Sequence, residues 1–270
     1  MSTNRLKFAG AGLLAAFALL LSSSAMAAGW PPMNMPEGVT EISREVYGLH
    51  MMMLIICAVI GALVFIIMLA SIILHRKSRG AEPAKWHEST SVEIIWTVIP
   101  FMILVAVAIP ATATLVKMED TSGAEMTVKI TGYQWNWHYD YLDHDIEFFS
   151  NLDADSTRAY QLGSDLSPLD VEYYLLNVDE PMVIPTNTRV RLLLTAGDVI
   201  HAWWVPEFAL KKDAIPGFIN EMWVDVEKPG IYRGQCAELC GRGHAFMPVV
   251  VIAKEPAEFE AWVAERTDTE

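Results

Sequence analysis

The sequence is poor in cysteine and in basic residues, and both shortages exclude classes of protein. Only 3 of its 270 residues are cysteine. None stands in a Cys-x-x-Cys-His motif, so the chain carries no covalently attached haem c. Lys and Arg number 19 against 33 Asp and Glu, which gives a formal net charge of −14. Such a surface repels nucleic acid and other anionic partners.

The acidic residues are concentrated in the C-terminal part of the chain. From residue 119 to 270 there are 27 Asp or Glu and 11 Lys or Arg. A surface of this sign attracts a basic protein. A solvated face that keeps the domain soluble accounts for the same composition, and net charge alone does not choose between the two interpretations.

The first residues have the pattern of an export signal. Arg5 and Lys7 precede an apolar run over residues 8–21, and an Ala-Met-Ala sequence follows. A basic start, a short apolar run and an Ala-x-Ala end predict a secretory signal peptide over residues 1–28. A signal anchor is the alternative, although the run is short for crossing a bilayer. Residues 29–48 are then an exported N-terminal segment.

Two longer apolar segments are predicted to cross the membrane. Residues 49–74 and 92–116 each exceed the roughly 20 residues that span the hydrocarbon core. The loop between them, residues 75–91, holds Arg76, Lys77, Arg79 and Lys85, and the positive-inside rule places it in the cytoplasm. The sequence therefore predicts a transmembrane hairpin with both outer ends and the domain 117–270 outside the cytoplasm.

The domain after the hairpin has the pattern of an all-β fold. Aromatic residues alternate with polar ones over Gly132–Tyr141, the period-two pattern of a strand. Further strands are predicted at 128–131, 173–176, 190–195, 222–226 and 249–253, and a short terminal helix at 256–263. Many short strands without alternating helices predict an antiparallel sandwich or Greek-key barrel.

The chemistry of the chain is concentrated between Cys236 and Met247. This stretch holds Cys236, Cys240, His244 and Met247, with glycines that let the backbone turn tightly. Thiolate, thioether and imidazole are donors that suit copper. Two cysteines four residues apart can bridge a pair of copper ions. A second imidazole must then come from elsewhere, and His201 is the best candidate.

A disulfide between Cys236 and Cys240 is the competing interpretation. Cysteine pairs in exported domains usually form disulfides. A bridge here, however, closes a very short loop and therefore stabilises little. It also leaves His244 and Met247 unexplained, so the four donors together favour copper.

The run from Gly234 to Pro248 closely resembles the binuclear copper (CuA) loop of cytochrome c oxidase subunit II. The resemblance extends over Val92–Pro100, Gly132–Tyr141 and Asp198–Pro216, and so covers most of the chain. It implies a cupredoxin-like periplasmic domain behind a two-helix transmembrane hairpin, in the bacterial inner membrane. It also implies that the chain accepts electrons from cytochrome c and passes them to haem in subunit I, within a complex that includes subunit III.

The resemblance implies a role for each residue of the copper loop. Cys236 and Cys240 share both sulfurs between two copper ions, and His201 and His244 each supply one imidazole. Met247 and the backbone carbonyl of Glu238 are weak outer ligands. The Glu238 side chain matches a glutamate that helps bind Mg²⁺ at the interface with subunit I, which must supply the remaining ligands.

Four further residues have a functional interpretation, and two of them, Glu93 and Trp135, have a structural one as well. Glu93 completes a capping box with Thr90 at the start of the second helix, and it also matches a glutamate at the mouth of a proton path into subunit I. Trp135 is either a core aromatic or, by the resemblance, the surface residue through which electrons enter. Asp140 and Asp198 flank the aromatic strand and His201, and are predicted to form part of a docking face for a basic cytochrome c.

Three other functions are weighed against this one. A membrane-anchored copper carrier needs an open, exchangeable site rather than a buried loop. The related structural subunit of quinol oxidases lacks the copper ligands, so Cys236, Cys240, His201 and His244 argue against it. Nitrous-oxide reductase has a similar loop, but it follows a large catalytic domain that this sequence lacks.

Overall fold

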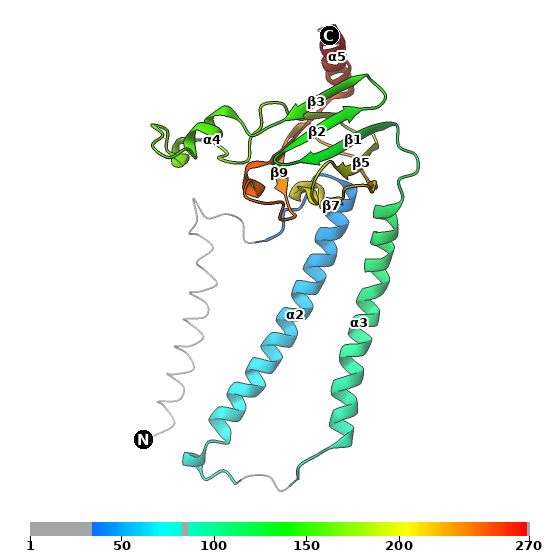
Figure 1. The fold of residues 1–270 in the computed structure, drawn as a ribbon. Coiled ribbons are helices and arrows are strands. Elements are labelled where there is room, and N and C mark those ends of the chain that lie inside the picture. Colours follow the sequence, from blue (N-terminus) through cyan, green and yellow to red (C-terminus); the bar gives the residue numbers. More distant parts are fainter. Residues whose placement is uncertain (1–33, 83–85, 269–270) are drawn as a thin grey trace. The chain divides into compact units, whose positions relative to one another are not determined.

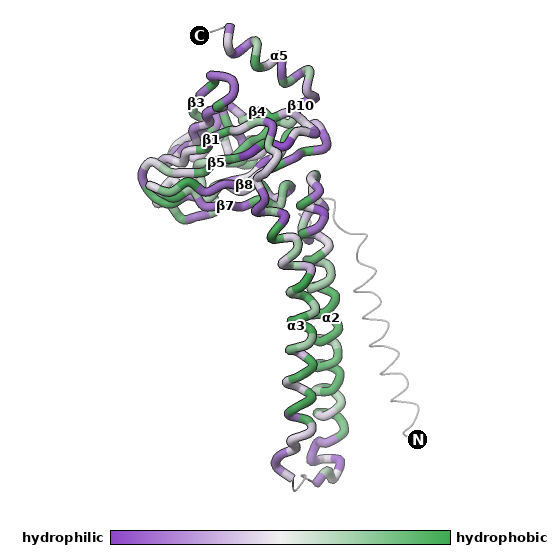
Figure 2. Tube along the Cα trace, turned by 90° about the vertical axis from the view of Figure 1, so that its right-hand side faces the viewer, coloured by the Kyte–Doolittle hydropathy of each residue, from purple (hydrophilic) through white to green (hydrophobic). Residues whose placement is uncertain are grey.

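The computed structural model describes residues 34–82 and 86–268. The predicted signal peptide, residues 1–28, lies outside the described residues. Two long helices, α2 (Glu41–Leu74) and α3 (Thr90–Glu119), precede a β domain, with the short helix η2 (Lys77–Arg79) between them. Both are long and apolar enough to cross a membrane, and their apolar side chains are exposed. Figure 2 shows this hydrophobic character along most of each helix.

Helix α2 begins at Glu41, eight residues before the predicted apolar segment 49–74, because Thr40 caps it. The Thr40 hydroxyl accepts the Ser43 backbone N–H at 2.9 Å, and the Ser43 hydroxyl accepts the Thr40 backbone N–H at 2.9 Å. This reciprocal pair satisfies two donors that the first turn of a helix leaves free. The charged first turns thus belong to the same helix as the apolar span.

The capping box predicted at Thr90 and Glu93 is not formed. The N-cap of α3 is Ser89, so Glu93 stands one position too late to reach back to it, and no side chain caps this end. Instead the Glu93 backbone N–H donates to the Ser89 carbonyl at 3.0 Å, and its side chain is exposed. The capping role predicted for Glu93 is therefore wrong, although its carboxylate does lie in the first turn of α3.

The β domain is a sandwich of two five-stranded sheets, with strand orders β3-β2-β1-β5-β8 and β4-β10-β9-β6-β7. The strands of the first sheet are β1 (Met126–Tyr133), β2 (Asn136–Tyr141), β3 (Ile146–Ser150), β5 (Val190–Ala196) and β8 (Asn220–Val224). Those of the second are β4 (Met182–Pro185), β6 (His201–Val205), β7 (Leu210–Ala214), β9 (Gly230–Cys236) and β10 (Pro248–Lys254). The predicted all-β sandwich is confirmed.

The sequence predicts antiparallel sheets, but both sheets are mixed. β1 pairs with β5, and β10 with β4, in parallel. The reason is that the chain crosses to the second sheet through β4 before it returns to the first as β5. Each sheet thereby receives one parallel pair.

Alternating burial along the strands forms the core between the sheets. In β5 every second residue is buried, and in β2 the buried positions are Trp137, Tyr139 and Tyr141, each 0% exposed. The buried Trp203 ring N–H donates to the Tyr139 hydroxyl at 3.3 Å across the core. The aromatic run is, however, not one strand, because the chain turns at Gln134 and Trp135 between β1 and β2.

The segment between β3 and β4 contains no strand, and the one predicted at 173–176 is wrong. It holds α4 (Ala154–Ala159), η3 (Pro168–Asp170) and a turn. Tyr173 and Leu175 have φ of 54° and 61°, the left-handed region that no strand adopts. The predicted terminal helix is present as α5 (Pro256–Thr267), whose Phe259 is buried against the sandwich.

The start of α2 and the end of α3 are bonded to the β domain. Thr40 and Val39 donate to backbone carbonyls of the residues around η4 (Pro206–Phe208), at 3.4 Å and 3.1 Å. The Trp223 ring N–H of β8 donates to the Lys117 carbonyl in the last turns of α3 at 3.2 Å. Both helices are thereby attached to the sandwich by specific hydrogen bonds.

Candidate metal centre

Three neighbouring strands position the donors that the sequence singled out. His201 is the first residue of β6 and Cys236 the last of β9, and the two strands pair antiparallel with Trp203 opposite Cys236. The loop from Cys236 to Met247 then leads directly into β10, which pairs with β9. Because both ends of the loop are fixed in one sheet, its donors lie next to the start of β6, where His201 stands.

The donor atoms lie close together, and all the residues that carry them are buried except His244, which is half-buried. The sulfurs of Cys236 and Cys240 are 3.9 Å apart, and both residues are 2% exposed. Nδ1 of His201 lies 3.9 Å from the Cys236 sulfur, and Nδ1 of His244 lies 3.6 Å from the Cys240 sulfur. The Met247 sulfur is 3.5 Å from that of Cys240. Each thiol therefore has an imidazole of its own.

The thiols are free, so the competing disulfide is not formed. Cys236 and Cys240 are both unpaired, and the Cys236 thiol donates to the Glu238 backbone carbonyl at 3.3 Å. This brings a carbonyl oxygen to the cluster, where the resemblance implied one. The ligand atoms of His201, Cys236 and Cys240 all lie within 4.8 Å of one another, which makes a compact soft-donor group that suits copper.

Close backbone packing holds the ligand loops, and two glycines allow it. A Cβ atom at Gly132 would lie 2.8 Å from Cδ2 of the His201 ring. A Cβ atom at Gly243 would lie 2.2 Å from Cδ2 of Trp135. Real Cβ contacts are not this short, so both positions need glycine. The His201 ring and the Trp135 ring are thus fixed against the backbone of neighbouring segments.

A second layer of polar groups orients the cluster. The Asp198 carboxylate lies 2.9 Å from Nε2 of His201 and accepts the Gln134 backbone N–H at 2.7 Å. The side chains of Gln134 and Trp135 both donate to the Cys240 carbonyl, at 2.8 Å and 3.1 Å. The β1–β2 turn therefore connects the His201 side of the cluster to the cysteine loop. Sequence reasoning missed Gln134, whose only signal is its place beside Trp135.

The two thiols of the cluster have different pKa values because their electrostatic surroundings differ. Burial raises the pKa of Cys236, but hydrogen bonds with His201, with the backbone of Ala202 and Glu238 and with His244 together outweigh burial and lower the pKa to about 7. Burial and the nearby Cys236 raise the pKa of Cys240 to about 12. One thiol thus ionises near neutrality, whereas the second requires a positive charge beside it. A bound cation supplies that charge, so metal binding releases protons.

The remaining predicted site residues lie outside the cluster. The Trp135 side chain is partly exposed, and Arg242 stands 5.5 Å from its ring centre. The Glu238 side chain is exposed, whereas its carbonyl faces the cluster. Asp140 lies on β2, 3.9 Å from the Lys129 amine, and Glu93 is on α3. The structure therefore brings Asp198 to the donor cluster, but not Asp140 or Glu93.

These features together define a class of protein: a membrane-anchored, cupredoxin-like β-sandwich with a donor cluster typical of copper. Comparison with known proteins names the family. The model for "Cytochrome C oxidase subunit II, periplasmic domain" matches residues 126–254, and the model for the transmembrane domain of the same subunit matches residues 28–113. The chain belongs to the cytochrome c oxidase subunit II family, and two helices anchor its periplasmic domain in the membrane.

Relatives with the same description span most of the chain. A probable cytochrome c oxidase subunit 2 of Rickettsia bellii is 40% identical over 235 residues, 87% of this chain and 84% of that protein. Cytochrome c oxidase subunit 2 of Cereibacter sphaeroides is 33% identical over 265 residues, 94% of this chain and 88% of that protein. The Rickettsia felis relative is 46% identical over 187 residues, but the match spans only 56% of its length.

A solved structure is also similar in sequence. The periplasmic domain of subunit II of cytochrome oxidase from Bradyrhizobium japonicum is 40% identical. The match covers 55% of this chain and 98% of that one, with a TM-score of 0.48.

Proposed function

We propose that this chain is the subunit through which a haem–copper oxidase receives electrons from a cytochrome c and delivers them to the haem of subunit I. The observation that carries the proposal is the pairing of the two buried thiols, 3.9 Å apart, with one imidazole each. A single blue-copper site needs only one thiolate. Two thiolates with two imidazoles fit a binuclear centre.

The residues that would hold the copper pair follow from this donor set. Cys236 and Cys240 would share their sulfurs, while His201 and His244 would each bind through Nδ1. Met247 and the Glu238 carbonyl would be the weak outer ligands. Such a pair, when bound, supplies a one-electron carrier whose charge is spread over two ions. The chain contributes a dry, rigid pocket, since strand ends hold His201 and Cys236.

Trp135 is proposed as the residue through which electrons enter. Its partly exposed ring faces Arg242 and lies in the turn between β1 and β2. Its ring N–H is bonded directly to the Cys240 carbonyl at 3.1 Å. A short covalent and hydrogen-bonded path therefore links the surface to a ligand, which supports this role for a ring that also packs against the edge of the core.

The remaining assignments concern partners. Asp140 and Asp198 are proposed to contribute to a docking face for a basic cytochrome c, because the domain is strongly acidic. The exposed Glu238 carboxylate is proposed to share Mg²⁺ with subunit I. Glu93, exposed and without a capping role, is proposed to stand at a proton path into subunit I. We also propose that the complex includes subunit III, that it lies in the bacterial inner membrane and that the loop 75–91 is cytoplasmic.

A copper carrier is a poorer fit to the same residues. A carrier must release its metal, which needs accessible and exchangeable ligands. Here Met247 is 1% exposed and both cysteines are 2% exposed. The site is therefore built to retain its metal.

The test is the copper content and electronic state of the purified full-length protein. We expect two copper ions per chain and an electron paramagnetic resonance spectrum of one electron shared by two equivalent nuclei. Replacement of either Cys236 or Cys240 by Ser should remove this signal. One copper per chain with a four-line, single-ion spectrum would reject the binuclear site, and with it the proposed function.

A further inference from the structure

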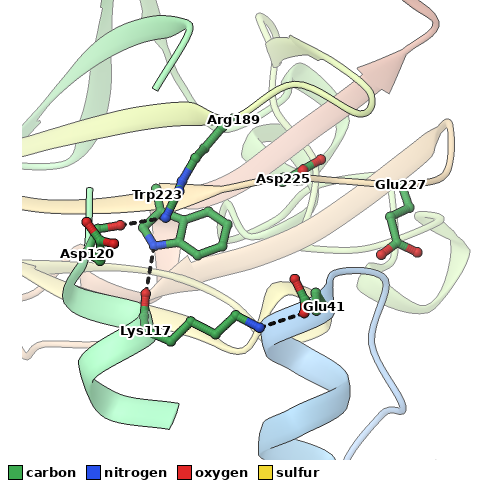
Figure 3. Close-up of a pocket in the computed structure, with 7 residues that line it drawn as sticks. All are labelled: Glu41, Lys117, Asp120, Arg189, Trp223, Asp225 and Glu227. Atoms are coloured by element: carbon green, nitrogen blue, oxygen red, sulfur yellow. Dashed lines mark hydrogen bonds and ion pairs between the residues drawn. The ribbon is translucent and has the colours of Figure 1, made fainter. Parts of the chain in front are cut away.

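A second site lies apart from the metal cluster, where the helices meet the β domain. A pocket of about 360 Å³ opens between the start of α2, the end of α3 and β8. Figure 3 shows the side chains that line it: Glu41, Lys117, Asp120, Arg189, Trp223, Asp225 and Glu227. Six of these seven are ionisable, so the pocket is suited to a charged ligand.

Most of these charges already have partners. Lys117 bridges Glu41 and Glu45 at 2.6 Å and 2.7 Å, and Arg44 pairs with Glu227. The Arg189 guanidinium stands 3.8 Å over the Trp223 ring, and one of its terminal nitrogens donates to the Asp120 carbonyl. These contacts fix the walls of the pocket rather than leave them free to collapse.

Two polar groups of opposite character remain without partners. Oδ1 of Asp225 is shielded from water and has no hydrogen-bond partner in the part of the chain that the structure describes. Nε of Arg189 is likewise buried and unpaired among the described residues. A buried polar group left unpaired costs roughly 1–3 kcal/mol. The pocket therefore offers one unmet acceptor and one unmet donor.

The surroundings of Asp225 favour a cationic group. Burial raises its pKa, and the neighbouring carboxylates Glu227 and Glu125 raise it further, whereas the nearby Arg189 charge lowers it but does not cancel the rise. A positive charge beside Asp225 relieves this repulsion. A bare metal ion would satisfy Asp225 but would leave the Arg189 donor unmet and face its positive charge. A ligand that carries both a cation and an anionic oxygen satisfies both.

The position of the pocket indicates the source of such a ligand. It lies at the membrane-surface end of both helices, since Glu41, Arg44 and Glu45 are the last charged residues before the apolar span of α2. On α3, an apolar groove is lined by Val105, Ala108, Ile109, Thr112, Ala113 and Val116. It ends at Val116, the residue before Lys117, so an apolar groove leads up to the charged pocket.

We propose that this junction pocket binds the headgroup of a zwitterionic phospholipid with a primary amine, of the phosphatidylethanolamine class, from the outer leaflet. The ammonium lies against Asp225 and donates to its carboxylate. A phosphate oxygen accepts from Nε of Arg189, and one acyl chain follows the groove on α3. The site rests on the membrane anchoring of the chain and does not depend on the copper chemistry.

The test compares lipids retained by the full-length protein in detergent, by native mass spectrometry. The protein is exposed to equal amounts of phosphatidylethanolamine, phosphatidylcholine and phosphatidylglycerol with identical acyl chains. We expect one retained phosphatidylethanolamine, preferred over the other two, because only it has both a primary ammonium and a phosphate. Asp225→Asn should reduce this preference about tenfold, the loss of one charge-assisted hydrogen bond. Arg189→Lys, which removes Nε, should weaken retention of all three lipids.

Two controls keep the result interpretable. Asp165→Asn, at an exposed carboxylate outside the pocket, should retain the wild-type preference. Glycerophosphoethanolamine, the headgroup without acyl chains, should not displace the bound lipid at equal concentration. Equal retention of the three lipids by the wild type, or an unchanged preference in folded Asp225→Asn, would overturn the proposal. Displacement by the soluble headgroup would overturn the role of the groove.

Discussion

The carboxylate of Asp198 lies 2.9 Å from Nε2 of His201, on the far side of the ring from Nδ1, which faces Cys236 at 3.9 Å. Hydrogen bonds from His201 and from backbone N–H groups lower the pKa of Asp198, although burial opposes this. A carboxylate in this position fixes the tautomer and orientation of a ligating imidazole. Asp198 therefore has a task inside the site in addition to its proposed part in docking.

The two proposed docking residues should consequently differ when each is replaced. Asp140→Asn should lower only the rate of association with a basic cytochrome c, because Asp140 has no contact with the cluster. Asp198→Asn should lower that rate and also shift the copper absorption spectrum. Stopped-flow association over a range of salt concentrations, with spectra of both variants, tests this. Identical spectra in the two variants would contradict the positioning role.

Met247 is expected to tune the centre rather than to hold it. Met247→Leu conserves volume at a position that is 1% exposed, so it should cost less than about 1.5 kcal/mol in unfolding free energy. Copper should remain bound while the reduction potential shifts, because only a weak ligand is lost. Redox titration measures the shift. Loss of all copper from a folded variant would mean that Met247 is a principal ligand.

Trp135→Gln should separate electron transfer from folding. The ring is partly exposed and stands in a turn, so its loss should cost far less than the 3–5 kcal/mol of a core tryptophan. Copper content and cytochrome affinity should stay nearly unchanged, while the rate of electron transfer into copper collapses. Flash-initiated transfer from bound cytochrome measures that rate. A normal rate in a folded, copper-loaded variant would exclude Trp135 and leave Trp137 as the next candidate.

Gly132 provides a test of the packing around His201. A methyl group there would meet the imidazole ring, with Cδ2 only 2.8 Å from the new Cβ. Gly132→Ala should therefore cost about 1–3 kcal/mol and disturb copper binding through His201. Gly61→Ala, where the added Cβ would meet nothing within 4 Å beyond the backbone of its own helix among the described residues, is the control and should bind copper normally. Thermal unfolding and copper titration of both variants distinguish a local effect from a general one.

Acid stability should depend on an ion pair on the first sheet. Arg191 on β5 lies 2.6 Å from the Glu221 carboxylate on β8, and its hydrogen bond lowers the pKa of Glu221 below the ordinary value of 4.5. The pair is half exposed, so it should contribute only about 0.5 kcal/mol. Because the folded pKa is lowered, that contribution is present above pH 4.5 and is lost as pH falls through the folded value.

Glu221→Gln should accordingly be less stable than the wild type at pH 7, and the difference should close in acid. Chemical unfolding at several pH values measures it. Glu260→Gln, an exposed residue of α5, is the control and should follow the wild type throughout. A difference between Glu221→Gln and the wild type that persists undiminished in acid would contradict the ion-pair explanation.

The donor set could be predicted from the sequence because four of its members lie in one short loop. His201 is distant in sequence and was found from its local motif, and β6–β9 pairing brings it to Cys236. What could not be predicted was the connection between loops. Gln134, Gly132 and Asp198 reach the cluster through a turn and a close backbone contact, which leave no periodic pattern in the sequence.

The incorrect predictions about the fold also arose from turns, close contacts and helix caps that leave no periodic pattern in the sequence. The pattern at 173–176 favours a strand, but left-handed residues and the contact of Arg233 with the Tyr173 ring, 3.7 Å away, give a turn. The aromatic alternation after Gly132 has the period of a strand and yet spans a hairpin turn. Helix α2 begins after its N-cap residue Thr40, and helix α3 begins after its N-cap residue Ser89. Hydropathy does not reveal which residue occupies the N-cap position.

The backbone N–H of Cys236 donates to the Met247 carbonyl at 3.2 Å, so the metal-bearing loop starts and finishes at one point of the sheet. In evolutionary terms the loop is a module. Its length and ligands can vary without shifting the register of β9 against β10, because that register is set outside the loop. Natural selection can therefore alter the metal chemistry of this scaffold while the sandwich stays the same.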